Sequence, residues 1–366
     1  MTIPFVDLKS QYKNLKKDID FAIQNVIEDT AFIKGKYVKK FEKEFAQAYG
    51  VKHCISCANG TDALYISMKA LDIGQGDEVI TVANSWISTS QTISQTGAKP
   101  VFIDIEPGYY TIDIDKIESK INKNTKAIIP VHLFGQPCSM DKIVDLCKSY
   151  NLNLIEDCAQ AHFAKLDNKN VGTFGISGTF SFFPGKNLGA YGDAGAIITN
   201  NEEFATKARM FANHGALIKH SHEIEGINSR LDGLQAAILS VKLKKIKNWN
   251  KKRLDNANYY NELFSFKNKV SIPLIRSRNS HVFHLYVIRT KKREKLIQKL
   301  KKLNIATSIH YPTPLPFLKA YSYLNCSIKD FPVAFDYSEK ILSLPIYPEL
   351  TKDKIEFVVD SVEAAI

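Results

Sequence analysis

The sequence predicts an α/β protein built around a mostly parallel β-sheet. Short apolar runs that are typical of buried strands alternate with helical stretches through the N-terminal part of the chain. This alternation favours a sheet with helices on both faces. With 366 residues, of which 45% are hydrophobic, the chain can bury a substantial core and is long enough for two domains.

The first expected elements are a helix over residues 36–49, with Gly50 as its C-cap, and a helix over Thr61–Ala70. A further helix is expected over Met140–Tyr150. The sheet is expected to contain the apolar runs Glu78–Val82, Pro100–Ile103, Ala127–Val131, Leu152–Ile155, Gly178–Ser181 and Gly195–Thr199.

A change of pattern near residue 245 predicts a second, smaller α+β domain. It opens with one long helix rich in lysine and asparagine, expected over Ser240–Phe266. The elements expected after it are a strand over Val282–Ile288, a helix over Lys291–Leu303, a short strand over Ala306–His310 and a closing helix over Lys352–Ala365. We therefore expect a large domain over residues 1–245 and a small C-terminal domain over residues 246–366.

Composition and charge exclude several classes of protein. No apolar stretch is long enough for a membrane helix, and the N-terminus lacks the pattern of a secretory signal, so a soluble cytoplasmic protein is expected. The net charge of +11 is densest over Lys242–Arg253, where a solvated helix face explains it better than nucleic-acid binding does. A positive field can still attract an anionic small substrate.

The six cysteines are too sparse for a disulfide framework. Cys54 and Cys57 have a C-x-x-C spacing, which could indicate a redox pair or half of a zinc site. No second such pair or nearby histidine pair completes a metal site, so buried, reduced cysteines and no metal are expected.

Four local features fall at expected strand ends or helix starts, where open α/β sheets bind ligands. At Gly60 and Thr61 a glycine and a hydroxyl residue open a helix, which can bind a phosphate or be an ordinary cap. Asn228 and Ser229, ahead of the helix Gln235–Lys242, leave the same two readings open.

The other two features carry charge. Asp157 follows a buried strand and needs a partner there, which can be a structural cation, a helix cap or a protonated pyridine nitrogen. Lys186 stands on a Pro-Gly turn between two strands, unlike the surface lysines elsewhere. A lysine shielded from water can lose its proton near neutral pH and act as a nucleophile, although an isolated lysine would be read as structural.

Together and in this order, the motifs resemble the DegT/DnrJ/EryC1/StrS sugar aminotransferases, a family of fold-type I pyridoxal-phosphate enzymes. The resemblance covers nearly the whole chain. It rests on Ile3–Leu8, Ala58–Leu64, Asp157–His162, Phe180–Gly195, Gly226–Leu231 and Ile309–Pro312.

The resemblance implies that pyridoxal 5'-phosphate is the cofactor and that Lys186 forms the Schiff base and shuttles the proton. It further implies that Asp157 pairs with the pyridine nitrogen, that Gln160 bonds the ring hydroxyl and that Trp86 stacks on the ring. Gly60, Thr61 and Ser181 would hold the phosphate, and Asn228 would reach the cofactor of a neighbouring subunit in a homodimer with shared sites.

The family reaction moves an amino group from L-glutamate to a nucleotide-linked keto sugar, and a lysine at position 186 favours transamination over dehydration. The residues around Lys186 are similar to those of relatives that aminate C3 of dTDP-3-keto-6-deoxyhexoses; C4 amination and a non-catalytic binding protein are the alternatives. His310, Tyr311 and Lys219 are candidate substrate contacts, with loop packing or a surface position as the alternative. Phe183, Phe163 and Pro316 depart from the family pattern, where tyrosine, glycine and histidine are common.

Overall fold

The structure, a computed structural model, describes residues 2–265 and 269–366. Its centre is a seven-stranded sheet with the strand order β1-β9-β8-β5-β4-β2-β3. Only β9 runs against its neighbours, so the sheet is mostly parallel, as the alternating pattern predicted. The strands are β1 (His53–Cys57), β2 (Glu78–Val82), β3 (Lys99–Ile103), β4 (Thr125–Ile129), β5 (Asn153–Asp157), β8 (Ser177–Ser181) and β9 (Gly195–Thr199).

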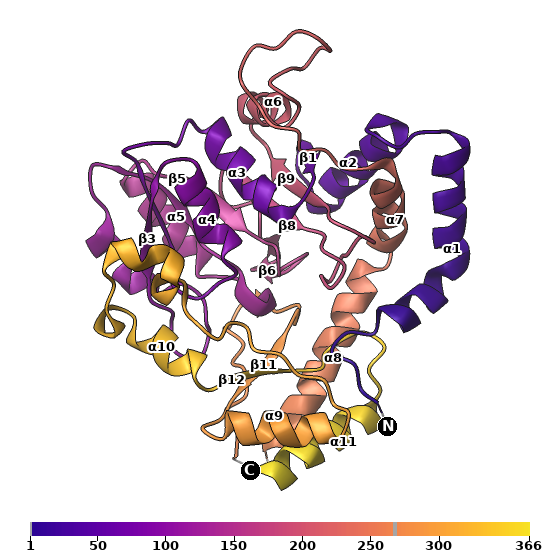
Figure 1. Cartoon of the computed structure of the whole chain (residues 1–366), viewed down its shortest axis with the longest axis vertical. Coiled ribbons are helices and arrows are strands. Elements are labelled where there is room, and N and C mark those ends of the chain that lie inside the picture. Colours follow the sequence, from indigo (N-terminus) through magenta and orange to yellow (C-terminus); the bar gives the residue numbers. More distant parts are fainter. Residues whose placement is uncertain (1, 266–268) are drawn as a thin grey trace.

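Helices cover both faces of this sheet (Figure 1). Successive residues of β4 show why: Ile128 packs into one apolar cluster and Ile129 into another, because side chains alternate along a strand. The helices are α2 (Gly35–Tyr49), α3 (Gly60–Ala70), α4 (Ser88–Gln95), α5 (Met140–Ser149), α6 (Glu202–Phe211) and α7 (Gly233–Leu243). Gly50 ends α2 in the left-handed conformation expected of a C-cap.

The helix α1 (Leu8–Glu28) was not expected from the sequence. Its N-terminus is capped by Asp7, whose carboxylate accepts a hydrogen bond from the backbone N–H of Ser10. It packs on α7 at one edge of the molecule, visible on the right of Figure 1. No helix of the described residues is long and apolar enough to cross a membrane.

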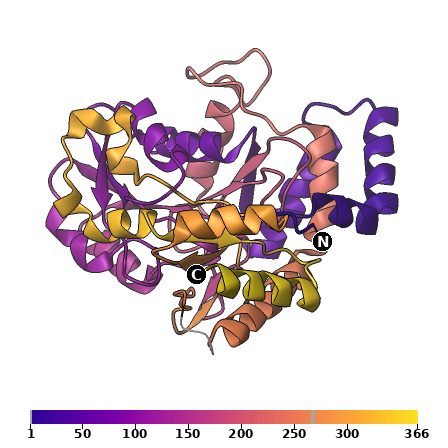
Figure 2. The same cartoon turned by 60° about the horizontal axis from the view of Figure 1, so that its bottom comes forward.

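The C-terminal part has its own apolar cluster, which includes Tyr260, Tyr286 and Leu300. Figure 2 brings its helices to the front. Its elements are α8 (Ile246–Ser265), α9 (Arg293–Lys302), α10 (Pro332–Ser338), α11 (Lys352–Ala365) and the antiparallel pair β11 (Tyr286–Arg289) and β12 (Ile341–Leu344). The small sheet beside the main one contains β6 (Lys165–Leu166), β7 (Lys169–Asn170) and β10 (Asn279–Ser280).

Three expectations for the C-terminal part need correction. The long helix expected over Ser240–Phe266 is two helices, because the chain turns at Lys244 and Lys245 between α7 and α8; Phe266 lies outside the described residues. The strand expected over Val282–Ile288 begins only at Tyr286. The strand expected over Ala306–His310 is reduced to one bridge, between Ser308 and Ser343.

We propose that the boundary between the two domains lies near residue 245, at this break between α7 and α8. The separate apolar cluster of the C-terminal part supports the division. The segment around α10 returns to the large sheet, since the backbone N–H groups of Val333 and Ala334 donate to the Asp104 carboxylate at 3.1 and 2.8 Å. The 3-10 turns are Ile114–Lys116, Glu118–Lys120, Leu133–Gly135, Leu315–Phe317, Lys319–Leu324 and Ile328–Asp330.

Candidate functional site

A cavity of about 370 Å³ opens at the carboxyl ends of the parallel strands. Segments far apart in the sequence meet there, since loops after several strands of an open α/β sheet converge at one edge. The residues that line the cavity are Asn59, Gly60, Thr61, Leu64, Ser85, Trp86, Ser88, Thr89, Val131, Asp157, Ala159, Gln160, Ser181, Phe183, Lys186, Asp193, His310 and Tyr311.

Asp157 is the last residue of β5 and is buried at the cavity wall. Its Oδ2 accepts a hydrogen bond from Thr89 Oγ1 at 2.9 Å, and its Oδ1 accepts one from the backbone N–H of Ala159 at 3.1 Å. Burial raises the pKa of this carboxyl, while both hydrogen bonds and the charge of Lys186 lower it. A cation in the cavity would stabilise the carboxylate further.

Lys186 lies on the turn between β8 and β9, where its backbone N–H donates to the carbonyl oxygen of Phe183 at 2.8 Å. Burial lowers the pKa of its amine to about 8, against the weaker opposing effect of the Asp157 charge. Gly189 lets the turn close tightly, because a Cβ there would lie 2.3 Å from the carbonyl oxygen of Pro184. The amine can therefore lose its proton near neutral pH.

Gly60 begins α3 and brings the backbone of this helix against β8. A Cβ at this position would lie only 2.6 Å from Cβ of Ser181. The side chain of Asn59 caps the helix by accepting from the N–H of Asp62 at 2.8 Å, and the Thr61 hydroxyl lies 2.7 Å from that of Ser88. Helix amides and hydroxyl groups at a positive dipole end can hold a phosphate.

Gln160, Trp86 and Tyr311 form another part of the wall. Gln160 Oε1 accepts from the N–H of Phe134 at 2.6 Å, and its Nε2 donates to the Tyr311 hydroxyl at 3.1 Å. The rings of Trp86 and Tyr311 lie 5.8 Å apart, and Trp86 is 59% exposed, so its face is open to the cavity. His310 Nδ1 lies 2.9 Å from the Ser343 hydroxyl.

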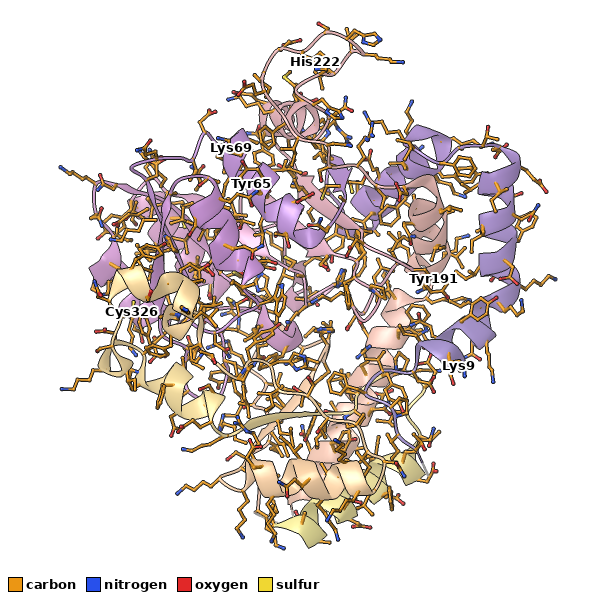
Figure 3. The ribbon with its side chains drawn as sticks, viewed as in Figure 1. Lys9, Tyr65, Lys69, Tyr191, His222 and Cys326 are labelled. Atoms are coloured by element: carbon orange, nitrogen blue, oxygen red, sulfur yellow. The ribbon has the colours of Figure 1, made fainter. Side chains whose placement is uncertain are left out.

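Two expected site residues lie outside the cavity of their own chain. Lys219 is exposed on the segment between α6 and α7, which projects from the molecule in Figure 1. Figure 3 labels His222 near the tip of the same segment. Asn228 follows this segment, is exposed and forms a bridge with Asn213. Neither residue is among those that line the cavity with Lys186 and Asp157.

Sequence reasoning missed Thr89 and Ser88, which hold Asp157 and Thr61. Both lie in the first turn of the short helix α4, which begins two residues after Trp86. Its hydroxyl-rich sequence, Ser88-Thr89-Ser90, was the available signal, because such residues are unusual in a buried helix without polar partners.

Glu156, next to Asp157, has a different role. Its carboxylate accepts from the backbone N–H groups of Gly172, Phe174 and Gly175 at 2.7, 2.6 and 2.9 Å, and lies 3.1 Å from His132 Nε2. Within the described residues, Glu156 and His132 group with Cys158 as a possible metal site. Glu156 and His132 already have hydrogen-bond partners in each other and in backbone N–H groups, so we assign no metal here.

Phe163 stands where the family commonly has glycine, and its backbone conformation is one that glycine favours. Phe163 has a φ of 63°, the left-handed conformation that favours the glycine common in the family. The centre of its ring lies 4.3 Å from that of the Tyr49 ring, and this packing explains how a phenylalanine is accommodated.

Cys54 and Cys57 are both free and buried, so they form no disulfide with each other. Their side chains belong to different apolar clusters.

The cavity fits pyridoxal phosphate by the chemistry of its donors. A buried carboxylate faces it from Asp157, an amine with a lowered pKa from Lys186, and a helix N-terminus from Gly60. These groups match a ring nitrogen, an aldehyde and a phosphate, respectively. When bound, this cofactor supplies an electron sink for the carbon atom that loses or gains a proton.

Comparisons with known proteins agree with this geometry. The chain is 44% identical over 361 residues to dTDP-3-amino-3,6-dideoxy-alpha-D-galactopyranose transaminase of Aneurinibacillus thermoaerophilus, with 98% of each chain covered. It is 43% identical to a pleiotropic regulatory protein of Geobacillus stearothermophilus, over 99% of this chain and 98% of that one. It is 40% identical to UDP-2-acetamido-2-deoxy-3-oxo-D-glucuronate aminotransferase of Pseudomonas aeruginosa, over 97% and 98% of the two chains.

A solved structure is similar over almost the whole chain. The Streptomyces venezuelae enzyme DesV, in complex with a ketimine intermediate, superposes with a TM-score of 0.97 at 36% identity and covers 99% of this chain and 98% of its own. The family model of the DegT/DnrJ/EryC1/StrS aminotransferases matches residues 13–363. The chain therefore belongs to the DegT/DnrJ/EryC1/StrS aminotransferase family and is a pyridoxal-phosphate-dependent sugar aminotransferase.

Proposed function

We propose that the protein transfers the amino group of L-glutamate to C3 of a nucleotide-linked keto sugar, a dTDP-3-keto-6-deoxyhexose. The observation that carries the proposal is that Lys186 and Asp157 line one cavity, beside the N-terminus of α3. The relative with 44% identity is named for a dTDP-3-amino-3,6-dideoxy sugar, which supports C3 and the dTDP carrier.

In this proposal Lys186 would hold the cofactor and would carry the proton of the reacting carbon. Its lowered pKa supports both tasks, because an amine must be neutral to attack and to accept a proton. Asp157, which Thr89 and Ala159 hold by hydrogen bonds, would keep the ring nitrogen protonated. The remaining cofactor contacts are Gly60, Thr61 and Ser181 to the phosphate, Gln160 to the ring hydroxyl and Trp86 to the ring face.

The sugar would lie against His310 and Tyr311, which line the cavity with Trp86. Phe183 also lines the cavity and is 57% exposed. Its ring would present an apolar edge to the sugar, where the tyrosine common in the family would present a hydroxyl group. This apolar edge supports a deoxygenated sugar, since a hydroxyl group placed there would lose its hydrogen bonds to water.

We further propose a homodimer in the cytoplasm, with active sites shared between two copies of the chain. Asn228 and Lys219 are exposed and lie outside their own cavity, which supports a role in the site of the neighbouring copy. The nearby exposed apolar residues Leu217, Ile218 and Ile224 support a protein contact there. The six free cysteines support a reducing compartment.

A panel of keto sugars tests the substrate. Purified protein with bound cofactor and L-glutamate would be given dTDP-3-keto, UDP-3-keto, dTDP-4-keto and UDP-4-keto hexoses, and amino sugar formation would be followed by mass spectrometry. We expect the highest kcat/KM with a dTDP-3-keto-6-deoxyhexose. A preference for a 4-keto sugar would move the reaction to C4, and turnover of none would favour a binding or regulatory protein.

The variant Lys186→Ala tests the catalytic residue. Turnover and the visible absorbance of the bound cofactor should both be lost, while the fold is kept. The control is Lys52→Ala, because Lys52 is exposed and precedes β1, at the end of the strand remote from the cavity. Turnover by Lys186→Ala would refute the assignment.

Mixing two variants tests the shared site. Lys186→Ala and Asn228→Ala each damage a different part of the proposed composite site, so each alone should have little activity. A randomly mixed dimer restores one intact site in half of the molecules, which predicts about a quarter of the wild-type activity. No recovery on mixing would contradict a site that uses Asn228 of the partner subunit.

A further inference from the structure

An uncharged chain of hydrogen bonds lies directly behind Lys186. The next residue, Asn187, is buried, and its Nδ2 donates to Oδ1 of Asn250 at 2.9 Å and to the carbonyl oxygen of Val282 at 3.0 Å. Asn250 belongs to α8 and donates through its own Nδ2 to the carbonyl oxygen of His162 at 2.8 Å. The turn that carries Lys186 is thus tied to the C-terminal part of the chain.

The direction of each hydrogen bond follows from chemistry. A backbone carbonyl can only accept, so Val282 and His162 fix which atom of each amide is the nitrogen. Oδ1 of Asn187 is therefore an acceptor, and it lies 3.2 Å from Nδ1 of His284. Nδ1 of His284 must carry a hydrogen. In a neutral imidazole the other nitrogen, Nε2, is then unprotonated.

The surroundings keep the His284 ring neutral. Burial lowers the pKa of His284 well below its usual range, and the charges of Lys186 and Arg253 lower it further. His310 and His162 are the other titratable groups that act on it, and burial lowers the pKa of His310 to about 4 and of His162 to about 3. The ring therefore has one hydrogen, and the network places it on Nδ1.

We propose that His284 is a positioning residue for Lys186: as its Nδ1–H tautomer it completes the hydrogen-bond chain that holds Asn187 and the turn carrying the lysine. The inference rests on the proposed role of Lys186. An anchor made of two amides and a neutral ring adds no charge beside the lysine. Burial and the charge of Asp157 therefore determine the pKa of the Lys186 amine. A carboxylate at the anchor would raise that pKa.

Neutron diffraction from crystals of the wild-type holoenzyme, exchanged into deuterated buffer at neutral pH, tests the tautomer directly. We expect deuterium on Nδ1 of His284 alone, and the amide deuterons of Asn187 directed at Val282 and Asn250. Deuterium on Nε2 alone, or on both ring nitrogens, would overturn the proposal. No variant or turnover is needed for this measurement.

Two substitutions at His284 test the positioning role. An asparagine side chain can place its Nδ2 where Nδ1 of histidine lies, so His284→Asn keeps the donor to Asn187, whereas His284→Leu removes it. We expect His284→Leu to lower kcat about tenfold, because a misplaced reactive group slows the chemical step. KM for L-glutamate should stay within about twofold, since the binding contacts remain.

Rescue separates positioning from other roles. His284→Asn should restore kcat to within about threefold of the wild type, because the hydrogen bond to Asn187 is the interaction that matters. If His284→Asn were as slow as His284→Leu, Nε2 would be the required atom and the proposal would be wrong. A failure of the proposed function is distinguishable, because it would appear as turnover by Lys186→Ala.

Discussion

The hydroxyl of Thr89 donates a hydrogen bond of 2.9 Å to the Asp157 carboxylate. Both side chains are buried, so Thr89, rather than bulk water, supplies a hydrogen bond that orients the carboxylate. Because it favours the charged form, the bond opposes the rise in the pKa of Asp157 that burial causes. A residue of α4 that sequence reasoning overlooked thereby prepares the acid that is proposed to pair with the cofactor.

We predict that Thr89→Val weakens binding of pyridoxal phosphate about tenfold, since a hydrogen bond to a charged group is lost. The dissociation constant would be measured by titrating the cofactor-free protein and following the absorbance. Thr92→Val is the matched control, because the Thr92 hydroxyl donates within α4 to the Ser88 carbonyl oxygen. Equal affinity of the Thr89 and Thr92 variants would contradict the orienting role of Thr89.

Asp157→Asn should make the cofactor-free protein more stable at pH 7. Burial raises the pKa of Asp157 above 3.8 in the folded state, so the folded protein holds this proton more tightly than the unfolded chain does. Ionisation of Asp157 therefore lowers the free energy of unfolding as the pH rises above 3.8, the value in the unfolded chain. We expect an increase in Tm of about 2 °C, or roughly 1 kcal/mol, together with loss of turnover. The gain should vanish in acid, below the unfolded pKa; a lower Tm at pH 7 would contradict it.

The rate at which cofactor-free protein takes up pyridoxal phosphate should rise with pH, with a midpoint near the Lys186 pKa of about 8. Only the neutral amine attacks the aldehyde, so the rate should increase about tenfold between pH 7 and pH 9. Stopped-flow absorbance would measure it, with Lys186→Ala as the blank. A midpoint near the ordinary lysine value of 10.5 would show that burial does not lower the pKa of this amine.

Gly60→Ala should weaken cofactor binding about tenfold or more, because the new Cβ would meet Ser181 at 2.6 Å and push apart the groups that we propose hold the phosphate. Gly74→Ala is the control, since the nearest atom to a Cβ there is a carbonyl oxygen at 3.6 Å. Isothermal titration with pyridoxal phosphate would compare the two. Unchanged affinity in Gly60→Ala would show that the cradle tolerates a wider spacing.

Phe163→Gly should destabilise the protein by about 2–4 kcal/mol. Glycine would relieve the left-handed backbone, a gain of about 1 kcal/mol, but the loss of the ring packed on Tyr49 is larger. Urea unfolding monitored by circular dichroism would measure the difference. A more stable variant would show that the conformation of Phe163 costs more than its packing contributes.

The periodicity of the sequence predicted the large sheet well, because buried parallel strands are short apolar runs between helices. It missed β1, whose Cys54 and Cys57 attracted attention as a possible redox or metal pair. It also joined α7 and α8, since the lysine-rich sequence stays helical in composition across the break at Lys244 and Lys245. Local sequence patterns do not show where tertiary packing breaks a helix.

Most of the site residues predicted from the motifs line the cavity, including Lys186, Asp157, Gly60 and Trp86. They could not show which partners hold these residues. The hydrogen bond between Gln160 and Tyr311 joins residues 151 positions apart, and no local pattern records such a contact. The same holds for the amide chain behind Lys186, which depends on α8.

Glu156 and Asp157 are adjacent in β5 and serve opposite faces of the sheet, one bonded to a loop and the other open to the cavity. Inserting a single residue upstream in this strand would move Glu156 to the cavity and leave Ile155 facing the loop amides. Deleting one would move Asp157 to the loop amides and leave Cys158 at the cavity. Variation among natural descendants of this chain should therefore tolerate substitutions along β5 more readily than changes in its length.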